Sequence, residues 1–330
     1  MSKKPYDFPR ARAGLDRISV IVKPSTPRDR LDVFLTTAFE GYSRSFLQEF
    51  IRQGNVLVNG RTVRPSHRIQ PGEEVAVILP EGAPMVPEDI PLQVIFEDNL
   101  LVAVSKQPGL VMHPARGHLS GTLLNGLLHR YADFMERQDF HLGALHRLDA
   151  DTSGVVLWAR EAEAHTYVAR QFERRKVKKS YLAIVHGRPA EDEFEVDAAL
   201  GYDPVDRRKI IVDGLHAKTA RTRFRVLADG ECGEVLSLVK AMPMTGRTHQ
   251  IRVHLASTGH PVTGDVIYGG RRENEAGEII GRQALHSERL GFTHPGNKQW
   301  TEVRAPLYDD VAALLQRSGI EVTTGTEESQ

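Results

Sequence analysis

The chain has 330 residues, 40% of them hydrophobic, and its 43 basic and 43 acidic residues give a formal net charge of zero. No apolar run approaches the roughly 20 residues of a membrane helix, and no apolar stretch follows the basic N-terminus, as it would in a secretory signal. The single cysteine excludes internal disulfides and a cysteine-based zinc site. We therefore expect a cytoplasmic protein that is long enough for more than one domain.

Charge is unevenly distributed along the chain. Residues 170–179, RQFERRKVKK, are strongly basic, whereas the PAEDEFEVDA stretch that follows is acidic. Local fields, rather than the net charge, attract a polyanion. The basic run is therefore either a solvated surface or a contact for a nucleic acid.

A small module is predicted over residues 18–82, after a loose arm over residues 1–17. Apolar residues recur at helical intervals in DRLDVFLTTAF, and YSRSFLQEFIRQG predicts a second helix that ends at Gly54. In VLVNGRTV, the pair Asn59 and Gly60 predicts a tight hairpin turn, and IQPGEEVAVILP adds a strand. We expect two helices followed by a small antiparallel sheet.

The proline-rich residues 83–91 are predicted to link this module to a larger domain over residues 92–320, which precedes an acidic tail over residues 321–330. In the larger domain, LQVIFEDNLLVAVSK, SYLAIVHG and VLSLVKAM are typical of strands, and REAEAHTYVARQFERRKV and RTHQIRVHLASTG of helices. Strands dominate, and strand and helix do not alternate regularly. The expected class is α+β with a largely antiparallel sheet.

Two carboxylates, Asp149 and Asp151, lie close together in HRLDADTSG, just before a short apolar run. A glycosidase pair must flank its substrate at about 5 to 10 Å, which neighbours in one loop rarely do. An aspartic protease needs a second Asp-Thr/Ser-Gly loop, which the chain lacks. A turn with local side-chain hydrogen bonds explains Thr152, Ser153 and Gly154, but it leaves HRLD unexplained.

The segment TGRTHQIRVH gathers basic and polar side chains near the start of a predicted helix. Its histidines, His249 and His254, are five residues apart, which is the wrong step for one helical face, and no acid completes a metal site. A polar helix start with basic groups favours an anion or phosphate. An exposed basic helix end is the alternative.

The sequence gives little support for a reactive cysteine or for a loop that binds a nucleotide cofactor. Cys232 lies in GECGEV, which has no basic neighbour to lower the pKa of its thiol, so it is not expected to be a nucleophile. No Gly-x-Gly-x-x-Gly or Walker-type loop occurs. The sequence therefore predicts neither a metal nor a nucleotide cofactor.

Three long motifs together resemble the RluA-type pseudouridine synthases, in the order of that family: HRLDADTSGVVLWAR, KKSYLAIVHG and TGRTHQIRVHLASTGHPVTGDVIYGG. The resemblance covers nearly all of the second domain and is closest to members that modify large-subunit ribosomal RNA. The first module is similar to the S4-like RNA-binding domain of a ribosomal small-subunit protein. The resemblance implies a mixed, mostly antiparallel sheet with the active cleft across it, RNA as the partner, and no cofactor or metal.

The resemblance also implies three catalytic residues. The aspartate of HRLD, here Asp149, is the catalytic carboxylate; Tyr181 of KSY stacks on the target base; and Arg247 of GRTHQIR pairs with the aspartate. We expect Arg247 to keep the carboxylate charged and oriented in a water-poor site. The carboxylate can act as a nucleophile or can remove a ribose proton, and the sequence leaves both routes open. Where the family usually has Lys-Pro-x-Gly this chain has KQPG, so the turn at residues 106–109 is also left open.

Further residues are predicted to bind RNA. They are His146, Arg147, Thr152, Lys179, His249, Gln250 and Arg252 in the motifs, and Arg44, Arg52 and Arg61 in the first module. The module is expected to contact RNA shape and phosphates rather than base edges. Two other functions stay open: a ribosome-assembly factor that binds RNA without turnover, and an RNA uracil methyltransferase, which the setting of Cys232 argues against. Nothing in the sequence predicts more than a monomer.

Overall fold

The computed structural model describes residues 17–22, 29–38, 44–78, 87–113, 120–131, 143–206 and 209–321. The predicted arm (apart from Arg17), the start of the predicted linker and the tail from residue 322 lie outside these residues. Within them, no helix combines the length and the apolar composition that crossing a membrane requires. The chain packs as two compact units, formed by residues 1–92, 110–144 and 159–162, and by residues 93–109, 145–158 and 163–330.

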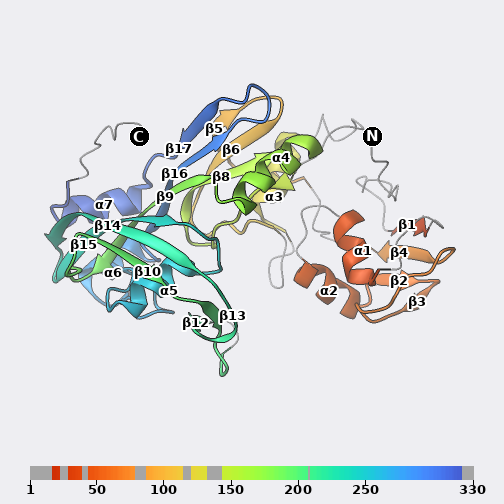
Figure 1. Ribbon diagram of the computed structural model, residues 1–330, viewed down its shortest axis with the longest axis horizontal. Helices are drawn as coiled ribbons and strands as arrows, with labels where there is room; N and C mark the ends of the chain where they lie inside the picture. The colour runs from red at the N-terminus through yellow and green to blue at the C-terminus, as the bar shows by residue number, and fades with distance from the viewer. Residues whose placement is uncertain are drawn as a thin grey trace. The chain divides into compact units, whose positions relative to one another are not determined.

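The first unit contains the small module that the sequence predicts. Its elements are β1 (Arg17–Ile21), α1 (Leu31–Ala38), α2 (Arg44–Arg52), β2 (Val56–Val58), β3 (Arg61–Thr62) and β4 (Glu74–Ile78), with the antiparallel sheet order β1-β4-β2-β3 (Figure 1). Leu31, Phe34 and Leu35 are completely buried, because helical spacing places them on one face of α1. Asn59 and Gly60 have φ values of 51° and 75°, which confirms the predicted hairpin turn.

The first unit also includes α3 (Leu123–Arg130) and the short strand β7 (Gly143–Ala144), which were not among the predicted elements. A capping box starts α3: the Asn125 side chain accepts from the Thr122 backbone N–H, and the Thr122 hydroxyl accepts from the Asn125 backbone N–H. The backbone N–H of Glu88 donates to the Asn125 carbonyl oxygen at 3.1 Å. The described end of the predicted linker therefore packs on this helix. The predicted domain boundary near residue 92 stays a prediction.

A large sheet forms the frame of the second unit. Its strands include β5 (Gln93–Glu97), β6 (Leu101–Lys106), β8 (Ser153–Ala159), β9 (Lys178–His186), β10 (Glu193–Asp197), β14 (Arg221–Glu231), β15 (Val235–Pro243), β16 (Leu285–Thr293) and β17 (Trp300–Arg304). The order is β10-β14-β15-β9-β16-β8-β6-β5, and β17 pairs with β16. The β16–β8 pair is parallel, whereas the other pairs of this set with a defined register are antiparallel. The expected α+β class with a mixed, mostly antiparallel sheet is confirmed.

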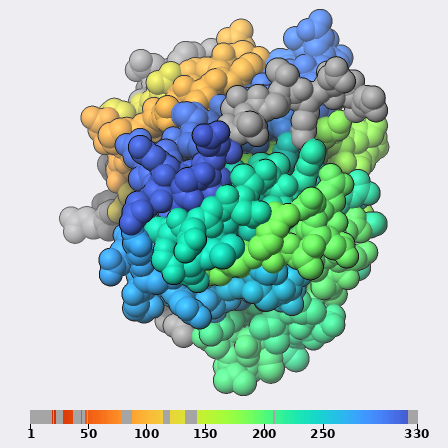
Figure 2. Space-filling model, turned by 90° about the vertical axis from the view of Figure 1, so that its left-hand side faces the viewer, coloured from red at the N-terminus to blue at the C-terminus, as the bar shows by residue number. Residues whose placement is uncertain are grey.

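Helices and a smaller sheet surround this frame. They are α4 (Ala162–Glu173), α5 (Gln250–Ser257), α6 (Glu275–Ile280), α7 (Asp309–Arg317) and the strands β11 (Leu200–Tyr202), β12 (Ile210–Val212) and β13 (Leu215–Lys218), ordered β12-β11-β13. Val253 of α5 is buried with Leu200 and Ile210 of the small sheet. Beyond α7, the Ser318 carbonyl oxygen accepts from the Glu231 backbone N–H of β14 at 2.9 Å, and Figure 2 shows α7 in dark blue beside the teal strands.

The large sheet brings the sequence motifs together. Tyr181 lies on the central strand β9, and Asp149 lies in the loop that leads into β8. Gly154 holds β8 against β16: its φ is +111°, and a Cβ atom there would lie 2.1 Å from the Ser287 carbonyl oxygen. A side chain at this position would push β8 and its preceding loop away from β16. The glycine of DTSG therefore serves the fold.

Candidate active site

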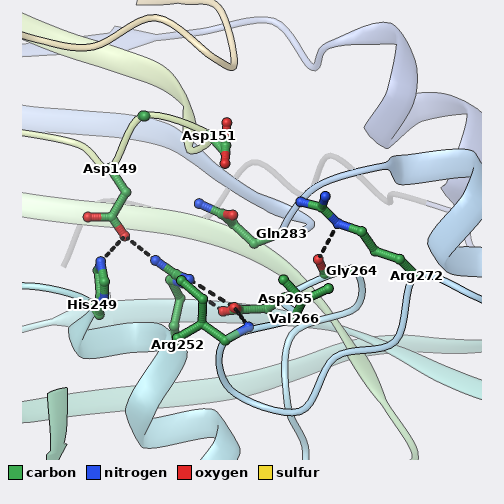
Figure 3. Close-up of a pocket in the computed structure, with 11 residues that line it drawn as sticks. Asp149, Asp151, His249, Arg252, Gly264, Asp265, Val266, Arg272 and Gln283 are labelled. Carbon is green, nitrogen blue, oxygen red and sulfur yellow. Dashed lines mark hydrogen bonds and ion pairs between the residues drawn. The ribbon is translucent and has the colours of Figure 1, made fainter. Parts of the chain in front are cut away.

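The carboxylate of Asp149 lies between an arginine and a histidine from the start of α5 (Figure 3). Its Oδ2 accepts a hydrogen bond from Nη1 of Arg252 at 2.9 Å, and Nε2 of His249 lies 3.8 Å from the same oxygen. The Asp149 side chain is 20% exposed. The HRLD loop thus presents a fixed carboxylate that a ligand can still reach.

Arg252 is itself fixed by a second carboxylate, that of the completely buried Asp265. Nε and Nη2 of Arg252 donate to the two Asp265 oxygens at 2.6 and 2.8 Å, and the guanidinium lies 5.0 Å from the centre of the Tyr268 ring. Burial by itself would lower the pKa of Arg252, but the hydrogen bonds and charges of Asp265 and Asp149 raise it overall. The guanidinium stays charged behind Asp149. Asp265 was not among the predicted site residues, although it lies in the PVTGD part of a family motif.

The structure corrects the predicted partner of Asp149, which is Arg252 and not Arg247. Arg247 precedes α5 and is exposed, and its Nε donates to the Thr219 carbonyl oxygen at 3.1 Å. Between the two arginines, His249 adopts a left-handed backbone (φ 55°), so the chain turns before the helix begins. The two guanidinium groups therefore have different surroundings, although both arginines belong to GRTHQIR.

Tyr181 is the second predicted catalytic residue, and it lines the same cavity as Asp149. Burial raises the pKa of Tyr181 to about 12; a hydrogen bond with the Ser287 side chain opposes this rise, and the charge of Asp149 adds to it. The phenol is therefore protonated at neutral pH. The structure thus places a neutral aromatic ring and a carboxylate in one cavity.

The cavity that joins these groups has a volume of about 450 Å³. This volume lies within the roughly 300 to 1,000 Å³ of small-molecule sites. Its polar lining includes Asp149, Lys179, Tyr181, Arg247 and His249. A smaller cavity of about 240 Å³ shares the Asp149, His249 and Arg252 side chains, and further residues around it are Asp151, Asp265, Val266, Arg272 and Gln283 (Figure 3).

Two buried basic side chains that the motifs did not identify hold the HRLDADTSG loop. Nζ of Lys106 donates to the Ala150 carbonyl oxygen at 2.6 Å, and Nη1 of Arg282 donates to the Asp151 carbonyl oxygen at 2.8 Å. The KQPG segment forms a turn in which Gly109 has a φ of +79°, so the shifted proline leaves Lys106 at the end of β6. The only sequence signal for this role of Lys106 was its position at the end of an apolar strand. Both side chains come from segments distant in the chain.

Lys106→Met is expected to remove a pH dependence of stability. Burial lowers the pKa of Lys106 from 10.5 to about 7, so the native amine loses its proton near pH 7 while the unfolded chain keeps it to about pH 10.5. Because the unfolded state then binds more protons, this group makes the unfolding free energy rise with pH between those values. Urea unfolding at about pH 6 to 10 tests this: the wild-type value minus the variant value should increase with pH. A constant difference would contradict the assignment.

Three residues predicted to bind RNA direct their polar atoms into the fold. The Gln250 side chain accepts from the Thr245 hydroxyl at 2.7 Å and donates to the Thr222 hydroxyl at 2.9 Å. Thr152 is 2% exposed, and Arg252 is 4% exposed and held by two carboxylates. Their polar atoms are thus satisfied inside the fold, although all three residues line the cavity that Asp149 and Tyr181 share. Direct RNA contacts by Thr152, Gln250 and Arg252 stay predictions.

His146 and Lys179 both line the cavity, and the pKa of each side chain is lowered. Burial, together with the charge of Lys179, lowers the pKa of His146 to about 3, and its Nε2 accepts from the Leu157 backbone N–H at 3.1 Å. The neutral ring supports the loop and offers a phosphate no charge. Burial lowers the pKa of Lys179 to about 8, and its Nζ donates to the Thr245 carbonyl oxygen at 2.8 Å. RNA contacts by Lys179 and the exposed Arg147 stay predictions.

In the first unit, Arg44, Arg52 and Arg61 are exposed. Asp32 is completely buried, and it accepts hydrogen bonds from Nε of Arg44 at 2.9 Å and from Nε of Arg30 at 3.0 Å. Burial would raise the pKa of Asp32, but its hydrogen bonds lower it overall, so the carboxylate stays charged. A buried anion thus orients two surface arginines. RNA contacts by Arg44, Arg52 and Arg61 stay predictions.

The remaining candidates concern a nucleophilic cysteine and a metal site. Cys232 is buried, and burial raises the pKa of its thiol, so the thiol is protonated at neutral pH. Across the part of the chain that the structure describes, no three His, Cys, Asp or Glu side chains form a group suited to a metal ion. These observations leave the Asp149 cavity as the candidate site.

Two family models match this chain. The model described as RNA pseudouridylate synthase matches residues 100–257, and the S4 domain model matches residues 29–75. The first match spans Asp149, Tyr181 and Arg252, and the second spans most of the small module. The S4 match lies within the first unit, whereas the synthase match includes residues of both units.

Relatives extend the match to nearly the full chain. An uncharacterized RNA pseudouridine synthase of Bacillus subtilis (strain 168) is 37% identical over 307 residues, which cover 92% of this chain and 98% of the relative. A ribosomal large subunit pseudouridine synthase D of Neisseria meningitidis serogroup B is 35% identical in an alignment 336 positions long, which covers 98% of this chain and 88% of the relative. The solved structure of human RNA pseudouridylate synthase domain containing 1 has a TM-score of 0.57 and 27% identity, and the match covers 69% of this chain and 89% of that one. The protein therefore belongs to the RNA pseudouridine synthase family.

Proposed function

We propose that this protein converts specific uridines of large-subunit ribosomal RNA into pseudouridine, with Asp149 as the catalytic carboxylate. One observation carries the proposal: Asp149 enters a cavity of about 450 Å³ beside the buried Tyr181, with Arg252 and Asp265 fixed behind it. The Neisseria relative's name and the S4 domain match support ribosomal RNA as the substrate.

The reaction needs few chemical groups. The bond between uracil nitrogen 1 and the ribose breaks, the base rotates, and a new bond forms from carbon 5 to the same sugar carbon. No atom is gained or lost apart from proton exchange, so no redox group is consumed. Asp149 either bonds to the electron-poor sugar carbon or removes a ribose proton, and both routes need a charged carboxylate with a fixed direction. Arg252, held by Asp265, fixes the direction of Asp149 through a hydrogen bond and places a positive charge beside it.

RNA must present the base outside its stack. Extruding a nucleotide costs a few kcal/mol, and an aromatic surface inside the cavity recovers part of this cost. The basic run over residues 170–179 leads directly into β9, and most of its Arg and Lys side chains are exposed. We infer that these side chains contact phosphates next to the target and guide the base towards Tyr181.

The test is to incubate the protein with large-subunit ribosomal RNA without any added cofactor and to detect pseudouridine by carbodiimide labelling. Product at discrete positions supports the proposal. RNA binding without product would instead identify an assembly factor. Uracil methylation that requires a methyl donor would identify a methyltransferase, a function to which the protonated, buried Cys232 is poorly suited.

Substitutions of Tyr181 separate stacking from chemistry. Tyr181→Phe should bind substrate RNA with wild-type affinity and isomerise it more slowly, because the ring remains and the hydroxyl is lost. Tyr181→Ala should also weaken binding, by about 1 to 3 kcal/mol for a lost stacking surface. Filter binding and single-turnover rates measure both effects. Equal affinity of the alanine variant and the wild type would remove the stacking role.

A further inference from the structure

The hydrogen bonds around His249 assign a proton to one nitrogen of its ring. The Tyr268 hydroxyl accepts the Ile210 backbone N–H at 3.1 Å, and it lies 2.6 Å from Nδ1 of His249. Burial lowers the pKa of His249, which favours the neutral ring. The bond that the phenol oxygen already accepts from Ile210 favours the phenol as the donor to Nδ1, and a neutral imidazole has one nitrogen that can accept it. The N–H of the ring is consequently at Nε2.

This N–H points towards the catalytic carboxylate without reaching it. Nε2 lies 3.8 Å from Oδ2 of Asp149, which is longer than a hydrogen bond (Figure 3). Both side chains line the cavity of about 450 Å³. A donor and an acceptor therefore stand next to each other in the cavity, and each has capacity for a further partner.

The ring is held in this direction by several contacts. His249 is the N-cap of α5 and has a left-handed backbone, which is uncommon outside glycine. Its ring meets the Tyr268 ring edge to face, with 5.5 Å between centroids, and its side chain is only 17% exposed. The donor thus has a fixed position relative to Asp149, as recognition of a small group requires.

A hydroxyl group fits this pair, because one hydroxyl both donates and accepts. Within an RNA chain, the sugar of an internal uridine has a single free hydroxyl, at the 2′ position, since its 3′ and 5′ oxygens are esterified. That hydroxyl is on the carbon next to the one whose bond to uracil breaks. A carboxylate placed against the reacting sugar carbon, as the proposed function requires, therefore has the 2′-hydroxyl beside it.

We propose that Nε2–H of His249 and the carboxylate of Asp149 together bind the 2′-hydroxyl of the target uridine. The hydroxyl accepts from His249 and donates to Asp149. This inference rests on the proposed function and adds a source of selectivity: the site distinguishes a ribonucleotide from a deoxyribonucleotide at the target position. Tyr268 acts as a positioning residue, because its phenol keeps Nδ1 an acceptor.

The experiment combines two substitutions, one in the protein and one in the RNA. Wild type and His249→Ala are each assayed on an RNA oligonucleotide with uridine at the target position and on the same oligonucleotide with 2′-deoxyuridine there. Wild type should be slower on the deoxy substrate by at least about tenfold, which is the value of one of the two lost hydrogen bonds in a site shielded from water. His249→Ala should lower the rate on the ribose substrate by a similar factor and have little further effect on the deoxy substrate.

Equal factors for His249→Ala on both substrates would overturn the inference, and so would a wild-type enzyme that does not discriminate. If turnover of the deoxy substrate is too slow to measure, the same four combinations are compared by Kd, with the same expected coupling. Failure of wild type on the ribose substrate would instead reject the proposed function. The two failures are therefore distinguishable.

Two further variants act as controls. His249→Gln keeps an amide N–H on a side chain of similar reach and should recover part of the preference for ribose. Tyr268→Phe keeps the ring beside His249 but frees its tautomer, so it should reduce the preference by less than His249→Ala does. Circular dichroism and the thermal midpoint show that each variant is folded. The inference would also be contradicted if both His249→Ala and Tyr268→Phe kept the preference of the wild type for ribose over deoxyribose.

Discussion

Asp149→Asn should abolish pseudouridine formation while RNA binding persists. The change removes the negative charge and keeps the shape of the side chain, and losses of roughly 10⁴-fold or more are typical when a group that acts directly on the substrate is removed. The fold should be retained, because Arg252 keeps its two hydrogen bonds to the buried Asp265. Single-turnover assays with ribosomal RNA fragments measure the rate, and filter binding measures the affinity.

Asp151→Asn is the matched control for this variant. Asp151 lies in the same loop, and the structure shows its backbone carbonyl oxygen, rather than its carboxylate, bonded to Arg282. Its substitution removes a charge near the buried Lys106 but keeps the backbone bond to Arg282, so the rate should change by about threefold at most. If Asp149→Asn turned over at the wild-type rate, or if Asp151→Asn lost more activity than Asp149→Asn, the wrong carboxylate would have been assigned.

Arg252→Lys should lose activity, whereas Arg247→Lys should not. The guanidinium of Arg252 donates to two carboxylates at once, two bonds to Asp265 and one to Asp149. A lysine ammonium keeps the charge but cannot reproduce this planar fork, so Asp149 would lose its fixed direction. A small misplacement of a catalytic group can cost about 10²-fold in rate. Because Arg252 is buried, the variant should also unfold at a lower urea concentration.

Arg247→Lys is the matched control, with the same chemical change five residues earlier. Arg247 is exposed, and a lysine at this position can still contact a phosphate, so rate and affinity should change by about twofold at most. Measured side by side, the two variants test the corrected partner of Asp149. The reverse ranking would restore Arg247 as the partner and would mean that the hydrogen bond from Arg252 is not used in catalysis.

Much of the local structure followed from short-range signals. The helical spacing of Leu31, Phe34 and Leu35 predicted α1, and the Asn59–Gly60 pair predicted the hairpin turn; the structure confirms both. These signals depend on neighbours within a few residues, so no knowledge of the fold is needed to interpret them. The helix α3 was not among the predicted helices, although it carries the same kind of signal: Leu123, Leu124, Leu127 and Leu128 recur at helical spacing after the N-cap Thr122.

The sequence by itself identified the family motifs and, through them, Asp149 and Tyr181 as candidates in one site. Tertiary structure alone decided which arginine faces Asp149, because the partner lies 103 residues away and its direction depends on the left-handed turn at His249. It also decided that Lys106 and Arg282 hold the loop and that Asp265 holds Arg252. Buried charges need partners at fixed distances, and these distances arise only when strands and helices from different parts of the chain have packed together.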